Sequence, residues 1–228
     1  METNLKIEKD DVCESNIKYR NFIGALLYVS LATRPDISYS VNYLSKFQNC
    51  YNETYYKYAL RILKYLYLTE DLKYKKNEKV ETLNCYVDAD WAGGINDRMF
   101  TTGYVIRLYG NVIHWKSKKQ RCVTKSPTFA EYIALSETDY ELIFIKEVVK
   151  TFNVRIDKPI KVYKDNFGAI NIAKYGNFTK NSKHIEIHYH YVHEYVEENT
   201  IDVIKIKSDE NIADIFTKSL CREKYKKF

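Results

Sequence analysis

The chain has 228 residues, of which 45% are hydrophobic and 29% are charged, and its formal net charge is +6. This size and hydrophobic content suffice for one medium domain and a smaller unit. No apolar run reaches the roughly 18 residues that a membrane-spanning helix needs, and residues 1–11 lack the apolar core of a signal peptide. We therefore expect an intracellular, cytoplasmic protein that has no membrane partner.

The five cysteines are odd in number and scattered, and no C-x-x-C pair occurs among them. This distribution argues against disulfides and against a cysteine-built zinc site, and it fits a reducing compartment. The mildly basic net charge permits a polyanionic partner without requiring one.

The first third of the chain has the apolar periodicity of helices. We expect helices over 17–32, from 36 to about 47 with Asp36 as the cap, and from Thr54 to about Leu68. Pro35 separates the first two, because the residue before proline avoids helical backbone angles. These patterns predict a polar tail at 1–18, a small helical unit at 19–69, and a charged linker at 70–81.

The remaining sequence alternates between strand and helix patterns. Strands are expected over 83–88, 102–109, 111–116, 159–164 and 201–207, with Gly110-Asn111 as the turn of a hairpin. Helices are expected over 127–152, with Ser126 as N-cap, over 166–174, over much of 182–198, and through Lys218 after a cap at Ser208 or Asp209. This order predicts an α/β fold, a mixed five-stranded sheet with flanking helices, over 82–220 and a basic tail at 221–228.

Four acidic residues stand at element ends or in apolar surroundings. Asp88 ends the first strand, Glu131 lies early in the long helix, Asp165 ends the fourth strand, and Asp214 lies in the last helix. An acid on an apolar face is costly to bury unless a cation compensates it. Convergence on divalent cations is one interpretation, since Mg²⁺ prefers carboxylate oxygens. Dispersed ion pairs are the alternative that spacing alone leaves open.

Two further groups of residues allow both a functional and a structural interpretation. A basic stretch beside the third strand could bind phosphates, or it could be a solvated turn; it contains Lys116, Lys118, Lys119 and Arg121. A histidine-rich segment also occurs at residues 184–193. A zinc site there is disfavoured, because a helix cannot present all four of its histidines on one face.

Motifs in order along the chain resemble one known family. The chain is similar to the ribonuclease H region of copia-type LTR retrotransposon Pol polyproteins in Y-V-D-A-D-W-A-G, T-T-G-Y, W-K-S-K-K-Q, A-E-Y-I-A-L-S-E, the D-N at Asp165, K-H-I-E-I-H-Y-H and I-A-D-I-F-T-K. It resembles the segment that joins reverse transcriptase to ribonuclease H in Y-R-N-F-I-G-A-L-L-Y, A-T-R-P-D-I-S-Y-S-V and L-R-I-L-K-Y-L. The resemblance runs from about Tyr19 to Leu220.

The resemblance implies a ribonuclease H-like fold and hydrolysis of the RNA strand of RNA–DNA hybrids. It implies that Asp88, Glu131, Asp165 and Asp214 are catalytic and bind two Mg²⁺ ions, for which Mn²⁺ can substitute, and that Asp90 has a lesser role. It also implies contacts with the hybrid from the basic stretch and from Asn166 and His184. A reverse transcriptase polymerase domain is a candidate partner, and a virus-like particle or the nucleus is an alternative location.

Two segments depart from the family pattern. S-P-T-F-A-E-Y stands where S-S-T-E-A-E-Y is common, and Met99 and Phe100 stand where R-K-S-T is usual. Neither removes a proposed ligand, but both alter neighbouring positions. The alternative is therefore a catalytically inactive or co-opted remnant that binds nucleic acid or a protein partner. Integrase-like strand transfer is disfavoured because no zinc-binding histidine–cysteine module is present, and no paired-aspartate strand of a polymerase precedes the helical unit.

Overall fold

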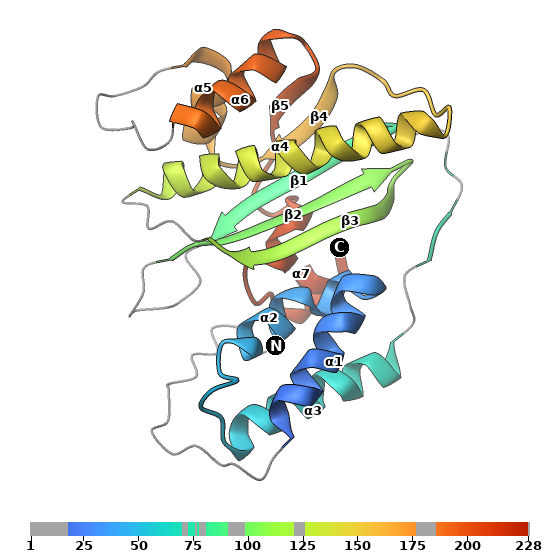
Figure 1. The fold of residues 1–228 in the computed structure, drawn as a ribbon, viewed down its shortest axis with the longest axis vertical. Helices are drawn as coiled ribbons and strands as arrows, with labels where there is room; N and C mark the ends of the chain where they lie inside the picture. The colour runs from blue at the N-terminus through green and yellow to red at the C-terminus, as the bar shows by residue number, and fades with distance from the viewer. Residues whose placement is uncertain are drawn as a thin grey trace.

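The computed structural model describes residues 18–69, 73–75, 77, 81–90, 99–120, 126–176 and 186–227. Its elements in chain order are α1 (Tyr19–Ala32), η1 (Pro35–Ile37), α2 (Ser38–Ser45), α3 (Glu53–Leu68), β1 (Leu83–Asp90), β2 (Thr101–Leu108), β3 (Asn111–Lys119), α4 (Pro127–Thr151), β4 (Ile160–Lys164), α5 (Phe167–Tyr175), α6 (Glu186–Glu197), β5 (Ile201–Lys205), η3 (Ile212–Phe216) and α7 (Arg222–Lys227) (Figure 1). None of the helices in these ranges combines the length and the apolarity that crossing a membrane requires.

The five strands form one mixed sheet in the order β3-β2-β1-β4-β5. β1, β2 and β3 pair antiparallel, whereas β1, β4 and β5 pair parallel. Figure 1 shows the long helix α4 running along one face of this sheet. The structure therefore confirms the α/β class expected from the sequence, a mixed five-stranded sheet with flanking helices.

Alternation along the strands gives the sheet its buried face. In β4 the residues at every second position, Ile160, Val162 and Lys164, are buried. Ile160 and Val162 pack in the main hydrophobic core together with Cys85 and Val87 of β1 and with residues of α4. The core thus lies between the sheet and α4, and it holds the N-terminal part of α4 close to the ends of β1 and β4.

The opposite face of the sheet carries a smaller cluster. Val105 of β2 and Trp115 of β3 pack there against Phe216 of η3. The helices α1 to α3 have a hydrophobic cluster of their own and lie on this side of the molecule (Figure 1). The indole Nε1 of Trp115 donates a hydrogen bond to the carbonyl of Ser30 at 2.8 Å. This contact ties the helical unit (residues 19–69) to the sheet. Most of the expected linker at 70–81 lies outside the described residues, so the domain boundary there stays a prediction.

Several local expectations are wrong. Asp36 does not cap the second helix; it lies within η1 and accepts hydrogen bonds from Arg34 at 2.7 Å and from the Tyr65 hydroxyl at 2.8 Å. The hairpin turn consists of Tyr109 and Gly110, whose φ values are 48° and 77°, and not of Gly110-Asn111. A two-residue turn needs left-handed backbone at both positions, and this places the turn one residue earlier.

The C-terminal region also differs from the expectation. The helix expected through Lys218 is a 3₁₀ turn, η3. Its cap is Asn211, whose side chain accepts a hydrogen bond from the Ala213 N–H, and not Ser208 or Asp209. Residues 222–227 form α7 where only a basic tail was expected. The Tyr225 hydroxyl donates to the carbonyl of Asp36, so contact with the helical unit orders this segment.

Two smaller expectations concern a helix cap and the cysteines. Ser126 occupies the N-cap position of α4, but its side chain makes no capping hydrogen bond. Cys50 is disulfide-bonded, contrary to the expectation, whereas Cys85 and Cys221 are free thiols.

Candidate metal centre

Three carboxylates from three separate elements converge at one end of the sheet. β1 and β4 are parallel neighbours in a register that pairs Tyr86 with Tyr163. Two residues further along each strand, this register brings Asp88 beside Asp165, and neighbouring strands are about 4.8 Å apart. Glu131 of α4 completes the group. One ligand oxygen from each of the three acids, which we call the carboxylate triad, lies within 4.8 Å of the others.

Neighbouring hydroxyl groups hold two members of the triad. Asp88 is 2% exposed, and the Thr217 hydroxyl donates a hydrogen bond to its Oδ2. The Ser208 hydroxyl donates to Asp165 Oδ2 at 2.6 Å. Asp165 Oδ1 is buried and accepts no hydrogen bond from any described residue. Three converging carboxylates, one with an unsatisfied buried oxygen, fit the oxygen ligands that Mg²⁺ prefers.

Glu131 occupies the most desolvated surroundings of the triad. Its residue is 7% exposed, and its Oε2 accepts a 2.5 Å hydrogen bond from the ammonium of Lys164. Burial, together with the charges of Asp88 and Asp165, raises the pKa of Glu131 to about 7, although the charge of Lys164 opposes the rise. The triad therefore holds more negative charge than this buried space readily accommodates, and it favours a cation.

Asp214 lies next to the triad and is not a member of it. It is fully buried in η3 and pairs with Lys218 at 2.9 Å and Lys224 at 2.5 Å. Lys218 also lies 3.6 Å from Asp88 Oδ2, so one ammonium bridges the two acids. Burial and the charge of Asp88 raise the pKa of Asp214, and the two lysines oppose the rise. Of the four expected ligands, three converge and the fourth is linked to them through a lysine.

Gly103 explains how η3 comes so close to Asp88. It pairs with Asp88 across the β1–β2 ladder. A Cβ atom at residue 103 would lie 2.5 Å from Thr217 Cγ2 and 2.8 Å from Phe216 Cβ, closer than real Cβ contacts. Only glycine lets η3 rest directly on the strand, and this close approach carries Thr217 and Asp214 to the metal centre.

The residues predicted to contact nucleic acid have different surroundings, unlike the three acids, which converge. Lys116 pairs with Glu141 of α4 at 2.9 Å. Asn166 caps α5 by accepting a hydrogen bond from the Ala169 N–H at 2.9 Å. Lys118 and Lys119 lie half-buried at the end of β3, and Arg121 and His184 lie outside the described residues.

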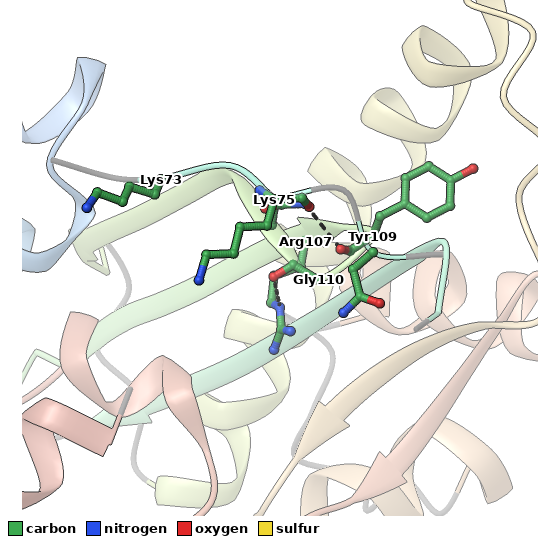
Figure 2. Close-up of a pocket in the computed structure, with 7 residues that line it drawn as sticks. Lys73, Lys75, Arg107, Tyr109 and Gly110 are labelled. Carbon is green, nitrogen blue, oxygen red and sulfur yellow. Dashed lines mark hydrogen bonds between the residues drawn. The ribbon is translucent and has the colours of Figure 1, made fainter. Parts of the chain in front are cut away.

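A basic pocket lies at the other end of β1, where Leu83 pairs with Leu108 beside the β2–β3 hairpin. Its lining includes Lys73, Lys75 and Arg107 (Figure 2). The Arg107 Nε donates to the carbonyl of Gly110 at 3.0 Å. Leu83 lies five positions before Asp88 in β1, a rise of about 17 Å, so this pocket is separate from the carboxylate triad.

Sequence reasoning missed the lysines around the acids and the hydroxyl groups that donate to two of them. Lys164 could have been found, because the alternation of β4 places it on the same face as Ile160 and Val162, directly before a proposed ligand. Thr217 and Lys218 follow Asp214 by three and four residues, the spacing of one helical turn, but nothing in the sequence links them to Asp88.

Relatives of known origin resemble this chain over most of its length. It is 36% identical over 212 residues to a retrovirus-related Pol polyprotein from transposon RE1 of Arabidopsis thaliana, a match that covers 92% of this chain and 14% of the relative. It is 35% identical to the corresponding polyprotein from transposon TNT 1-94 of Nicotiana tabacum, over 92% of this chain and 16% of the relative. The chain thus spans about one seventh of the length of these relatives.

A shorter relative and a solved structure complete the comparison. The secreted RxLR effector protein 161 of Plasmopara viticola is 37% identical over 132 residues, which cover 57% of this chain and 92% of that protein. LC11-RNase H1, isolated from compost, is 19% identical with a TM-score of 0.46, over 65% of this chain and 98% of that chain. No protein-family model matches the sequence. Over 92% of its length, the chain is therefore similar to one region of the retrovirus-related Pol polyproteins of copia-type transposons.

Proposed function

We propose that this chain is a ribonuclease H that hydrolyses the RNA strand of RNA–DNA hybrids with the help of two Mg²⁺ ions, for which Mn²⁺ can substitute. The observation that carries the proposal is the carboxylate triad, whose ligand oxygens lie within 4.8 Å of one another. A binding site for divalent cations built from buried carboxylates suits the hydrolysis of phosphodiesters.

In this proposal Asp88, Glu131 and Asp165 hold the ions directly, and Asp214 completes the catalytic set. Bound ions would supply an activated water and charge stabilisation of the departing oxygen. The hydroxyl groups of Thr217 and Ser208 fix the carboxylates to which they donate. No side chain of the set needs to act as a covalent nucleophile.

The proposed substrate is a polyanion, and the candidate contacts to its phosphates are Lys118 and Lys119 at the end of β3, together with Arg121, which follows them in the sequence. Phosphate contacts of this kind position a duplex without reading its sequence. Lys116 and Asn166 already have structural partners, so we assign them the supporting roles described above. Discrimination of RNA from DNA requires a contact to the 2′-hydroxyl, for which His184 remains a candidate.

A polymerase partner is a further part of the proposal. The relatives are several times longer than this chain, and residues 19–69 resemble the segment that follows reverse transcriptase in such polyproteins. We therefore propose the helical unit as the attachment to a polymerase domain.

A second candidate function is a catalytically inactive relative that binds nucleic acid or a protein partner. One observation favours it, the ammonium of Lys164 on Glu131 Oε2 at 2.5 Å. A resident lysine provides the charge compensation that a metal ion would otherwise provide at that oxygen.

The test incubates the full chain with a 5′-labelled RNA–DNA hybrid and MgCl₂ or MnCl₂. Asp88→Asn keeps the size of the side chain and an oxygen that can accept from Thr217, but it removes the charge. Asp202→Asn is the matched control, because Asp202 of β5 pairs with Lys174 of α5 and belongs to no part of the proposed site. Circular dichroism checks that each variant is folded.

We expect the wild type and Asp202→Asn to cleave the RNA strand and Asp88→Asn to leave it intact. Duplex RNA should remain uncleaved by all three proteins. If the folded wild type does not cleave the hybrid, or if Asp88→Asn cleaves it equally well, the proposal is wrong. Salt-sensitive binding of the hybrid without cleavage would instead support the inactive relative.

A further inference from the structure

Lys164 is a lysine without access to water. It is the last residue of β4, directly before Asp165, and it is 0% exposed on the face of the sheet that packs against α4. Lysine is almost never fully buried unless its charge is paired. Its partner is Glu131, whose Oε2 lies 2.5 Å from the ammonium nitrogen. The lysine thus contacts a member of the carboxylate triad from inside the core.

A second buried acid depends on the same lysine. Asp139 lies two turns beyond Glu131 in α4 and is 0% exposed. Neither of its carboxyl oxygens has a hydrogen-bond partner in the described part of the chain. Burial raises the pKa of Asp139 well above its ordinary value, and the charge of Lys164 is what opposes that rise. Lys164 is therefore the cation whose charge acts on both of these buried acids of α4, Glu131 and Asp139.

Unlike the other lysines around the acids, Lys164 cannot extend its side chain into water. The side chains of Lys218 and Lys224 are 34% and 26% exposed, so they can extend into water when another cation arrives. The side chain of Lys164 is enclosed and has no such path. A divalent ion at Glu131 would have to share this oxygen-rich space with an ammonium of like charge, which it would repel at close range.

We infer that Lys164 is a resident cation of the metal centre, which stabilises Glu131 when no metal is bound and weakens the binding of Mg²⁺ or Mn²⁺. This inference rests on the proposed metal site and names the residue that sets its affinity. The centre then behaves differently from an open carboxylate cluster, because the fold does not need a metal ion to neutralise Glu131. Lys164 therefore opposes the binding of a metal ion to the carboxylate triad.

The experiment compares the full-length wild type with Lys164→Met and Lys164→Gln, which remove the charge while keeping much of the length. Lys164→Arg keeps the charge and should resemble the wild type. Lys161→Met is the matched control, because Lys161 lies in the same strand, pairs with Glu81 at 2.7 Å and carries the same charge. Titration with MnCl₂, followed by the electron paramagnetic resonance signal of free Mn²⁺, measures affinity, and thermal unfolding is measured with and without MnCl₂.

We expect Lys164→Met and Lys164→Gln to bind Mn²⁺ about tenfold more tightly or better, since they leave Glu131 buried without a cation. Without metal they should unfold at a lower temperature than the wild type, and Mn²⁺ should raise their unfolding temperature more than it raises that of the wild type. Lys161→Met should match the wild type in both measurements. Neutral variants that fold only when Mn²⁺ is present would also support the inference.

Three outcomes would overturn it. The inference is wrong if the neutral variants are folded and bind Mn²⁺ no more tightly than the wild type. Hybrid cleavage by the wild type would in that case leave the proposed function intact. Neutral variants that fail to fold with and without Mn²⁺ would show a purely structural lysine. If no variant binds Mn²⁺ and the wild type does not cleave the hybrid, the proposed function fails as well. Tight binding only after removal of Lys164 would support the inference and favour the inactive relative.

Discussion

Replacing Gly103 with alanine should damage the candidate metal centre without touching any of its ligands. Gly103 lies in β2 opposite Asp88, and η3 rests on it. The added methyl group would meet Thr217 Cγ2 at 2.5 Å, Phe216 Cβ at 2.8 Å and the carbonyl oxygen of Ala213 at 3.1 Å. Carbon atoms pack at about 3.5–4.0 Å, so the methyl group is about 1 Å too close to its nearest neighbour.

The surrounding contacts decide how that overlap is relieved. Thr217 cannot rotate its methyl group away without losing the hydrogen bond from its hydroxyl to Asp88. Phe216 is 1% exposed and packed in the core on this face of the sheet. We therefore expect η3 to move away from β2 by about 1 Å, at a cost of about 1–3 kcal/mol in unfolding free energy. A displacement of this size at a catalytic group also lowers activity strongly.

The assay is urea unfolding of Gly103→Ala together with hybrid cleavage. Gly24→Ala is the matched control, because Gly24 lies in α1 and a Cβ there would meet nothing within 4 Å. Alanine is favoured over glycine inside a helix, so this control should be stabilised by about 0.5–1 kcal/mol. The same substitution is thus expected to have opposite signs at the two positions. A Gly103→Ala protein as stable and as active as the wild type would refute the reasoning.

Two further predictions test the supports of the site and of the sheet. Asn211→Ala should lower the unfolding free energy by about 2 kcal/mol. The reason is that the fully buried Asn211 side chain donates to the carbonyl of Val87 at 3.0 Å and also caps η3. An unchanged urea midpoint would contradict this prediction. Glu81→Gln should cost at most about 1 kcal/mol at pH 7, since the pair with Lys161 is largely solvated. Burial opposes the shift, but hydrogen bonds, first of all from Lys161, lower the pKa of Glu81 below its ordinary 4.5. Its contribution is therefore present above pH 4.5 and lost as the pH falls through the lower folded-state pKa, so unfolding curves of the two proteins should converge in acid and not in alkali.

The sequence by itself determined the fold class and the order of the five strands and of the long helices between them. Alternation in segments such as P-I-K-V-Y-K predicts half-buried strands, and the pattern after Ser126 predicts the long helix that covers the sheet. The strand patterns also placed Asp165 directly after a strand, whereas Asp88, expected as the last residue of the first strand, lies two residues before the end of β1 at Asp90. These properties depend on local periodicity, which is written in a short window of residues.

Only the tertiary structure decided which charges meet. Glu131 and Lys164 are separated by 33 residues, and Thr217 and Asp88 by 129, yet each pair shares a hydrogen bond. No local pattern encodes such distances, since they depend on how α4 and η3 pack on the sheet. For the same reason the structure, and not the sequence, separated Asp214 from the triad and buried a lysine within reach of Glu131. The candidate acids followed from their places in the sequence pattern and from the family resemblance; which of them converge, and which cations compensate them, depended on packing.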